Sequence, residues 1–245
     1  MKCRNFAHRG FSGKYPETTM RAFRKAVEAG CEGIELDVHF TKDHEIVIIH
    51  DETIDRTSKR KGTVKDMTYE ELSKINFCGK YRWKVKFQKI PTLREYFEYV
   101  KDKDIITNIE LKNGVYDYPG LEEAVYQMIC EFDLKDKVIL SSFNHYSIMR
   151  MKKIDPTIRC GFLTDTWILG QGQYLNDHKV EAYHPRFSML SDEVVSDLKD
   201  HGCQINTWTV NKRSDIDRMI DIEVDGIISN YPDKVLEELK QRGLR

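Results

Sequence analysis

The sequence predicts an α/β fold in which eight strand–helix units form a TIM (β/α)8 barrel. Three observations lead to this prediction. Short apolar runs typical of strands alternate with amphipathic runs typical of helices along the 245 residues. The alternation contains eight strands once the return strand of one hairpin is left out. A length of roughly 250 residues is typical of this architecture. We therefore expect a single domain over residues 1–245, with a small insertion at about 52–90.

The first half of the chain contains three barrel strands and the insertion. The apolar stripe of Met20, Phe23 and Ala26, followed by Gly30, indicates the first helix. Within the insertion, Thr68 begins a short helix with the pattern of a capping box. The other elements follow from the same patterns: strands at about 4–7, 33–38 and 105–111, and helices at about 18–29 and 92–101.

The second half continues the alternation without a long interruption. Apolar runs predict strands at about 137–142, 158–163, 180–183, 204–209 and 226–229. Amphipathic runs predict helices at about 119–132, 144–153, 191–201, 214–221 and 232–242. Residues 165–178 have a poor helical pattern, so we expect a loop or a short turn there.

The stretch from Gly33 to Asp51 contains a hairpin with an unusual polar face. Glu35 and Asp37 share one side of the first strand because side chains alternate with a period of two. Two neighbouring carboxylates need a cation, a basic partner or open water. A two-residue turn at Asp43-His44 would place His50 directly opposite Asp37. A hairpin with a solvated polar edge explains this stretch equally well.

Reactive side chains follow most of the predicted strands, at the end where barrels of this kind carry out chemistry. One such residue is weak evidence, because a polar side chain at a strand end often only stabilises a loop. Their convergence on one rim is hard to explain by structure alone. The residues are His8, Arg9, Glu35, Asp37, Glu110, Lys112, Ser142, Phe143, His184, Trp208, Ser229 and Asn230.

Three of these carboxylates indicate a metal site. Glu35, Asp37 and Glu110 form an all-oxygen set, which suits Mg²⁺ or Ca²⁺ better than zinc. Arg9 and Lys112 add permanent positive charge on the same rim. Bound metal flanked by Arg and Lys is suited to an anionic substrate, phosphate above all.

Two histidines complete the predicted chemistry. His8 and His50 titrate near neutral pH, so they can accept and donate a proton. Together with the cations, they point to metal-assisted phosphoryl chemistry on a phosphodiester.

The residues in order resemble the glycerophosphodiester phosphodiesterase family. The resemblance covers residues 4 to 232. It rests on His8-Arg9-Gly10, Pro16-Glu17-Thr18-Thr19, Glu35-x-Asp37, His50-Asp51, Arg56-Thr57, Ile90-Pro91-Thr92-Leu93, Glu110-x-Lys112, Ser142-Phe143, Trp208-Thr209-Val210-Asn211 and Asp225-Gly226-Ile227-Ile228.

This resemblance implies hydrolysis of a glycerophosphodiester, such as glycerophosphocholine, to an alcohol and sn-glycerol 3-phosphate. It implies a divalent cation, Ca²⁺ or Mg²⁺, and a small-molecule substrate. The implied metal ligands are Glu35, Asp37 and Glu110, the acid/base pair is His8 and His50, and the phosphate contacts are Arg9 and Lys112. The sequence does not assign the two proton-transfer roles, although His50 is favoured as the acid. Phe143 and Trp208 either line the alcohol pocket or pack against the rim.

Three departures from the family pattern stand out. Thr18 replaces an asparagine, His44 replaces a turn glycine, and Ser229-Asn230 replaces Thr-Asp. None is expected to touch the metal ligands or the histidines. They leave the details of substrate fit open but not the reaction class.

Composition excludes several other classes of protein. A formal net charge of −1 indicates neither nucleic-acid nor membrane binding. Without an apolar leader or a run of ~20 apolar residues, we expect a soluble cytoplasmic protein with no stable membrane insertion. The six widely spaced cysteines are expected to be buried free thiols. The oligomeric state stays open.

Three other functions remain at this stage. A lysophospholipase D-like enzyme would use the same chemistry on lysolipids, and an exposed apolar lip would favour it. A Mg²⁺-dependent barrel lyase or aldolase also uses strand-end carboxylates, but it leaves two histidines beside Arg9 unexplained. A non-catalytic barrel that binds phosphate esters would need the cations but not both histidines.

Overall fold

The computed structural model describes residues 3–81, 83 and 85–245; Arg82 and Lys84, in the predicted insertion, lie outside the described residues. Eight parallel strands form a closed ring, because β1 pairs with both β2 and β9. The TIM barrel prediction is therefore confirmed. The strands are β1 (Arg4–His8), β2 (Gly33–Phe40), β4 (Ile106–Leu111), β5 (Val138–Ser142), β6 (Cys160–Thr164), β7 (Ala182–Pro185), β8 (Gln204–Thr207) and β9 (Gly226–Ser229).

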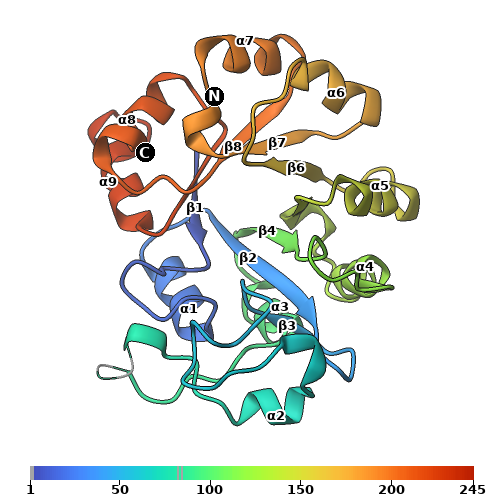
Figure 1. The fold of residues 1–245 in the computed structure, drawn as a ribbon. Coiled ribbons are helices and arrows are strands. Elements are labelled where there is room, and N and C mark those ends of the chain that lie inside the picture. Colours follow the sequence, from blue (N-terminus) through green and yellow to red (C-terminus); the bar gives the residue numbers. More distant parts are fainter. Residues whose placement is uncertain (1–2, 82, 84) are drawn as a thin grey trace.

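Helices cover the outside of the ring (Figure 1). Their buried faces and the outward faces of the strands form the main apolar core. Thr19, Thr92 and Ser191 cap their helices by accepting a backbone N–H with the side chain. The helices are α1 (Met20–Glu28), α3 (Leu93–Val100), α4 (Leu121–Glu131), α5 (His145–Ile154), α6 (Gln171–His178), α7 (Asp192–Asp200), α8 (Arg213–Asp221) and α9 (Pro232–Gln241).

Helix α6 corrects the expectation of a loop or short turn at residues 165–178. Its buried face is small, comprising Gln171, Gly172 and Leu175, so the sequence lacks a clear apolar stripe. Tertiary contact with α7 compensates, since Gly172 N donates to Asp197 Oδ2 at 2.8 Å. Packing rather than periodicity therefore explains this helix.

The segment between β3 (Ile46–Ile48) and α3 is the predicted insertion, and it lies against one side of the ring (Figure 1). It contains α2 (Tyr69–Ser73), which begins with the expected capping box at Thr68. Tyr81 Oη donates to the carbonyl of Gly13 at 2.8 Å, which ties the segment to the loop after β1. Its own apolar cluster consists of Val47, Ile49, Ile54, Val64, Leu72, Phe77 and Ile90.

The hairpin register differs from the prediction by one residue. Val38 pairs with Ile48, and Phe40 pairs with Ile46. The turn contains three residues rather than two and ends at His44, whose φ of +59° is the left-handed conformation usual for such loops. As a result Ile49, not His50, lies opposite Asp37, and Ile49 N donates to Asp37 O at 3.1 Å.

His50 still reaches the barrel mouth. Strand β3 ends at Ile48, and the chain bends at His50 instead of continuing the pairing. His39 supports the bend, because its Nε2 donates to the carbonyl of His50 at 3.2 Å. The predicted hairpin register was therefore wrong, but His50 still lies at the barrel mouth.

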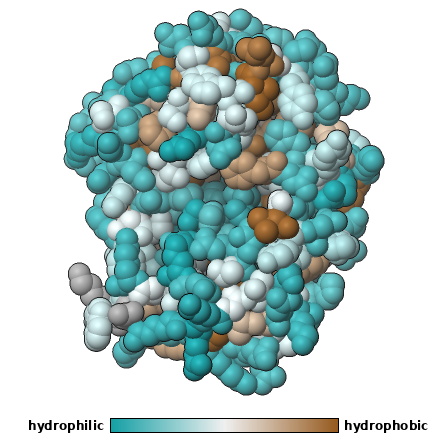
Figure 2. All heavy atoms as spheres, viewed as in Figure 1, coloured by the Kyte–Doolittle hydropathy of each residue, from teal (hydrophilic) through white to brown (hydrophobic). Residues whose placement is uncertain are grey.

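Two further sequence expectations concern the surface and the cysteines. No helix in the described ranges is both long and apolar enough to cross a bilayer. Figure 2 shows a mainly hydrophilic face with scattered brown apolar residues.

All six cysteines are free, but Cys130 is exposed, so the expectation of burial is wrong there. Cys130 lies near the end of α4, on its solvent side.

Candidate active site

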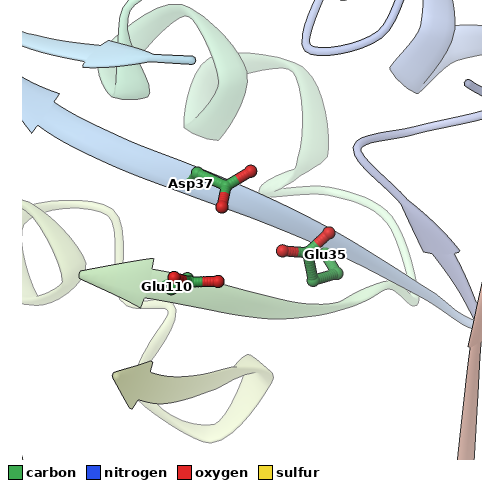
Figure 3. Close-up of side chains that lie close together, drawn as sticks. All are labelled: Glu35, Asp37 and Glu110. Carbon is green, nitrogen blue, oxygen red and sulfur yellow. The ribbon is translucent and has the colours of Figure 1, made fainter. Parts of the chain in front are cut away.

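Three buried carboxylates meet at the carboxyl ends of β2 and β4. Asp37 pairs with Glu110 across the two strands, and Glu35 lies one side-chain repeat earlier on β2. Each offers an oxygen within 4.8 Å of the others. Figure 3 shows all three side chains projecting from the two neighbouring strands. The structure thus brings the predicted metal ligands together.

The electrostatics of this cluster suit a cation. Among the residues that the structure describes, none donates a hydrogen bond to either carboxylate oxygen of Asp37. Burial raises the pKa of Glu35 to about 7, and Glu110 contributes to the rise. Burial, Glu35 and Glu110 raise the pKa of Asp37 well above its usual range. A divalent cation would relieve both effects, and the hard oxygen donors fit Mg²⁺ or Ca²⁺.

Arg9 and Lys112 are the cations beside the carboxylates. Arg9 Nε lies 3.7 Å from Asp37 Oδ2, and Lys112 Nζ lies 2.9 Å from Glu110 Oε1. Arg9 has a positive φ of 55°, and its backbone N–H donates to Glu35 Oε2 at 3.0 Å. Two cations against three carboxylates leave one negative charge in excess, which again favours a bound metal.

His8 has a neutral polar partner on its far side. Its Nδ1–H donates to Asn230 Oδ1 at 2.6 Å. This bond leaves Nε2 unprotonated, 3.9 Å from Glu35 Oε2. Burial, reinforced by Arg9, lowers the pKa of His8 to about 3. A neutral imidazole with a free Nε2 lone pair is suited to accept a proton.

His50 has a carboxylate partner instead. Its Nδ1–H donates to Asp51 Oδ1 at 2.6 Å, and its Nε2 lies 3.5 Å from Lys112 Nζ. Arg56 holds Asp51 in place with two hydrogen bonds and binds Glu17 with two more. Burial, reinforced by Arg9 and Lys112, lowers the pKa of His50, but the Asp51 carboxylate opposes this shift because it stabilises the imidazolium. Of the two histidines, His50 is therefore the better suited to donate a proton.

These groups surround a cavity of about 270 Å³ at the barrel mouth. Phe143 and Trp208 form part of its wall, with ring centroids 5.6 Å apart in an edge-to-face contact. Trp208 is fixed by its Nε1–H, which donates to the carbonyl of His184 at 2.9 Å. The lining residues are His8, Arg9, Glu35, His50, Asn108, Glu110, Lys112, Phe143, Leu163, Trp208 and Ile228.

Some candidates lie outside the cavity, and some of its residues were missed. His184 is fully buried beneath Trp208, where its Nε2 accepts from Asn206 Nδ2 at 3.0 Å. Asp37 does not line the cavity either, because it is fully buried, although one of its oxygens lies within 4.8 Å of those of Glu35 and Glu110. Asn108 was missed, although it precedes Glu110 by one side-chain repeat, the spacing that places both toward the same side.

Asn230 belongs to one of the three departures from the family pattern, which were expected to touch neither the metal ligands nor the histidines. For Asn230 this expectation is wrong. Asn230 accepts the Nδ1 hydrogen of His8, although 222 residues separate the two. The signal was available in part, because Asn230 follows the last strand and His8 ends the first. A closed barrel already places these two strands side by side, but the sequence did not show that the Asn230 side chain turns toward His8.

Known proteins resemble this chain in sequence and in fold. Residues 8–234 match the model of the Glycerophosphoryl diester phosphodiesterase family. A glycerophosphodiester phosphodiesterase of Caldanaerobacter subterraneus is 41% identical, with 99% of this chain and all of that protein covered. One of Bacillus altitudinis is 42% identical, covering 96% and 98%.

A solved structure supports the same relationship. A phosphodiesterase of Oleispira antarctica, in complex with the product sn-glycerol-3-phosphate, superimposes with a TM-score of 0.86 at 27% identity. The match covers 96% of both chains. Together with the geometry of the barrel mouth, these similarities show that the chain belongs to the glycerophosphoryl diester phosphodiesterase family of enzymes.

Proposed function

We propose that the protein is a metal-dependent phosphodiesterase that hydrolyses glycerophosphodiesters to an alcohol and sn-glycerol 3-phosphate. The observation that carries this proposal is that two carboxylates, two cations and two histidines line one cavity, and that the third carboxylate, Asp37, has an oxygen within 4.8 Å of the other two. Family membership and the product complex of the Oleispira antarctica relative support the substrate class.

The carboxylates would hold the cation, either Ca²⁺ or Mg²⁺. When bound to Glu35, Asp37 and Glu110, it would supply positive charge that neutralises the cluster and polarises the phosphate. Arg9 and Lys112 would contact the phosphate oxygens, since both reach the cavity as permanent cations.

The hydrogen-bond partners of the two histidines suggest their roles. His8 Nε2 accepts a proton from the attacking water, because Asn230 holds its hydrogen on Nδ1. His50 donates a proton to the leaving alcohol, because Asp51 stabilises its charged form. Phe143 and Trp208 form the wall against which the alcohol or the glycerol packs.

Release of sn-glycerol 3-phosphate from glycerophosphocholine tests the proposal. We expect turnover by the wild type with Mg²⁺ or Ca²⁺ and its loss in EDTA, with recovery when metal is restored. His50→Ala and Glu35→Ala should each reduce turnover by at least a hundredfold. Full activity in EDTA would overturn the metal role. Absence of turnover on any glycerophosphodiester would favour the barrel that only binds phosphate esters.

Replacing Asn230 tests the role of His8. Asn230→Leu should lower kcat about 10- to 100-fold, because partners behind a functional imidazole commonly contribute that much. KM should change little, since Asn230 lies behind the ring and does not line the cavity. Asn211→Leu, which removes the oxygen that accepts from the backbone N–H of Asn230, should cause a smaller loss of the same kind. An unchanged kcat in Asn230→Leu would remove the proposed orientation of His8.

A second candidate substrate is a lysolipid, which a specific surface feature favours. Five large hydrophobic side chains are exposed on the segments after β4, β5 and β6, and one of them, Phe143, lines the cavity. They are Val115, Phe143, Tyr146, Trp167 and Leu169.

This apolar lip would accommodate an acyl chain beside the reacting phosphodiester. The same assay therefore includes lysophosphatidylcholine, whose hydrolysis releases choline and lysophosphatidic acid. Leu169→Ser should reduce its kcat/KM selectively, while Leu244→Ser, an exposed leucine at the C-terminus, should not. Equal rates for all three proteins would leave the soluble glycerophosphodiesters as the substrates.

We also propose a cytoplasmic location. All six cysteines are free thiols, which suits a reducing compartment. Small soluble phosphodiesters would be the partners there.

A further inference from the structure

A buried polar network lies directly behind the ends of β4 and β5. Asn113, the residue after Lys112, is 3% exposed and occupies its centre. The side-chain amide of Asn113 donates to Glu122 Oε1 at 3.0 Å and to Ser147 Oγ at 2.7 Å. The backbone that follows Lys112 is thus held by side chains of α4 and α5.

The same network extends to the residue before Phe143. Ser142 Oγ lies 2.9 Å from the carbonyl oxygen of Leu111 and 3.2 Å from Asn113 Oδ1. The backbone N–H of Asn144 donates to Ser142 Oγ at 3.0 Å. Contacts on both sides of Lys112, and on both sides of Phe143, therefore belong to one set of hydrogen bonds.

Glu122 is the buried carboxylate of this network. It lies in the first turn of α4 and is 2% exposed, which is costly for a carboxylate without partners. Its Oε1 accepts from Ser147 Oγ at 2.6 Å, from Arg150 Nε at 2.9 Å, and from the Asn113 amide. Arg150 supplies the compensating charge from α5, with Nη2 at 2.7 Å.

Helix α5 provides a natural comparison at its other end. Lys152, 8% exposed, donates to Glu181 Oε1 at 2.5 Å and to the carbonyl of Ile158 at 2.8 Å. This second ion pair joins the buried Lys152 to the partly exposed Glu181. It lies where β6 and β7 begin, at the opposite end of the barrel from the cavity. The two networks are alike in chemistry, but only that of Glu122 contacts the neighbours of cavity residues.

We propose that Glu122 is a positioning residue for Lys112 and Phe143, acting through Asn113 and Ser142. It fixes the distance between Lys112, the cation proposed to contact the phosphate, and the Phe143 ring, which lines another part of the cavity. The inference rests on the proposed function, because it assigns Lys112 to the phosphate. Nothing in it requires Glu122 to touch the substrate.

Kinetics of Glu122 variants test this role. Glu122→Leu removes the acceptor for Asn113 and Ser147. We expect KM for glycerophosphocholine and the inhibition constant for sn-glycerol 3-phosphate to rise together, about tenfold, with kcat changing less than threefold. Glu122→Gln keeps an acceptor oxygen and should restore both constants to within threefold of the wild type, even if its Tm is lower. Ser147→Ala, a milder change, should show a smaller rise in both.

Lys152→Met is the matched control. It removes the ion pair between Lys152, which lies on the same helix as Ser147 and Arg150, and Glu181. It should lower Tm without changing either constant. Unchanged constants in Glu122→Leu, or an equal rise in Lys152→Met, would overturn the inference and reduce Glu122 to a stabilising residue. If Glu122→Leu fails to fold, Ser147→Ala decides by the same criterion. A wild type without turnover would instead refute the proposed function.

Discussion

Asp37→Asn is expected to abolish phosphodiester hydrolysis while stabilising the metal-free protein. The variant loses a carboxylate from the centre of the proposed metal site, where Asp37 faces Glu110 across the strands. Positive charge supplied by a metal contributes several kcal/mol to such reactions, so the rate should fall by at least ~10³-fold. The side chain keeps its shape, so the fold should be retained.

The gain in stability has an electrostatic cause and a predictable pH dependence. The folded, metal-free state raises the pKa of Asp37, so it holds the proton more tightly than the unfolded chain. Stability from such a group is present at low pH and is lost as pH rises, and Glu35 behaves in the same way between its ordinary pKa and about 7. Asp37→Asn removes one such loss, worth ~1.4 kcal/mol per unit of pKa shift.

Urea denaturation in EDTA at pH 5 and pH 8 measures this effect. The free energy of unfolding of the variant should exceed that of the wild type by more at pH 8 than at pH 5. Because the two proteins are compared at the same pH, the contribution of the buried histidines is the same in both and cancels. Added Mg²⁺ should stabilise the wild type alone. Glu98→Gln, which neutralises an exposed carboxylate on α3, should change neither stability nor activity. A less stable Asp37→Asn in EDTA would mean that Arg9 and Lys112 already compensate the cluster.

Replacing each histidine with glutamine should distinguish the base from the acid. Both variants should lose about 10²- to 10⁴-fold in kcat on glycerophosphocholine, since each lacks one proton transfer. A glycerophosphodiester with a p-nitrophenol leaving group needs no protonation on departure. On that substrate His50→Gln should recover most of its activity, whereas His8→Gln should remain impaired because the water still needs its base.

The experiment compares kcat for the two substrates in the three proteins. Asp51→Asn, which alters the partner of His50 without touching the cavity wall, should follow the pattern of His50→Gln in weaker form. If His8→Gln instead recovers its activity on the p-nitrophenol substrate, His8 is the acid and His50 the base. Recovery of neither would mean that departure of the alcohol does not limit the rate.

Much of the site could be predicted because it depends on local periodicity. Glu35 and Asp37 share a face by alternation, and the strand count places Glu110 on the neighbouring barrel strand. A barrel brings strand ends to one rim whatever the loops between them do. These relations survive small errors in element boundaries.

The predictions that were wrong or missing concern features that the alternation of side chains along a strand does not determine. The hairpin register depended on whether the turn has two or three residues, and His44 in a left-handed conformation decided it. Helix α6 depends on contact with α7. The bond between His8 and Asn230 forms where the closure of the ring brings the first and last strands together. It depends on the direction of the Asn230 side chain in the loop after β9, which no local pattern reveals.

That closure has a consequence for synthesis of the chain on the ribosome. His8 is synthesised 222 residues before Asn230, whose side chain orients it. The three carboxylates of the cluster, Glu35, Asp37 and Glu110, are also synthesised long before Asn230. The proton acceptor can therefore acquire its working orientation only after Asn230 has been synthesised and β9 has paired with β1. A chain that stops before Asn230 would contain every proposed metal ligand but would lack the residue that orients His8.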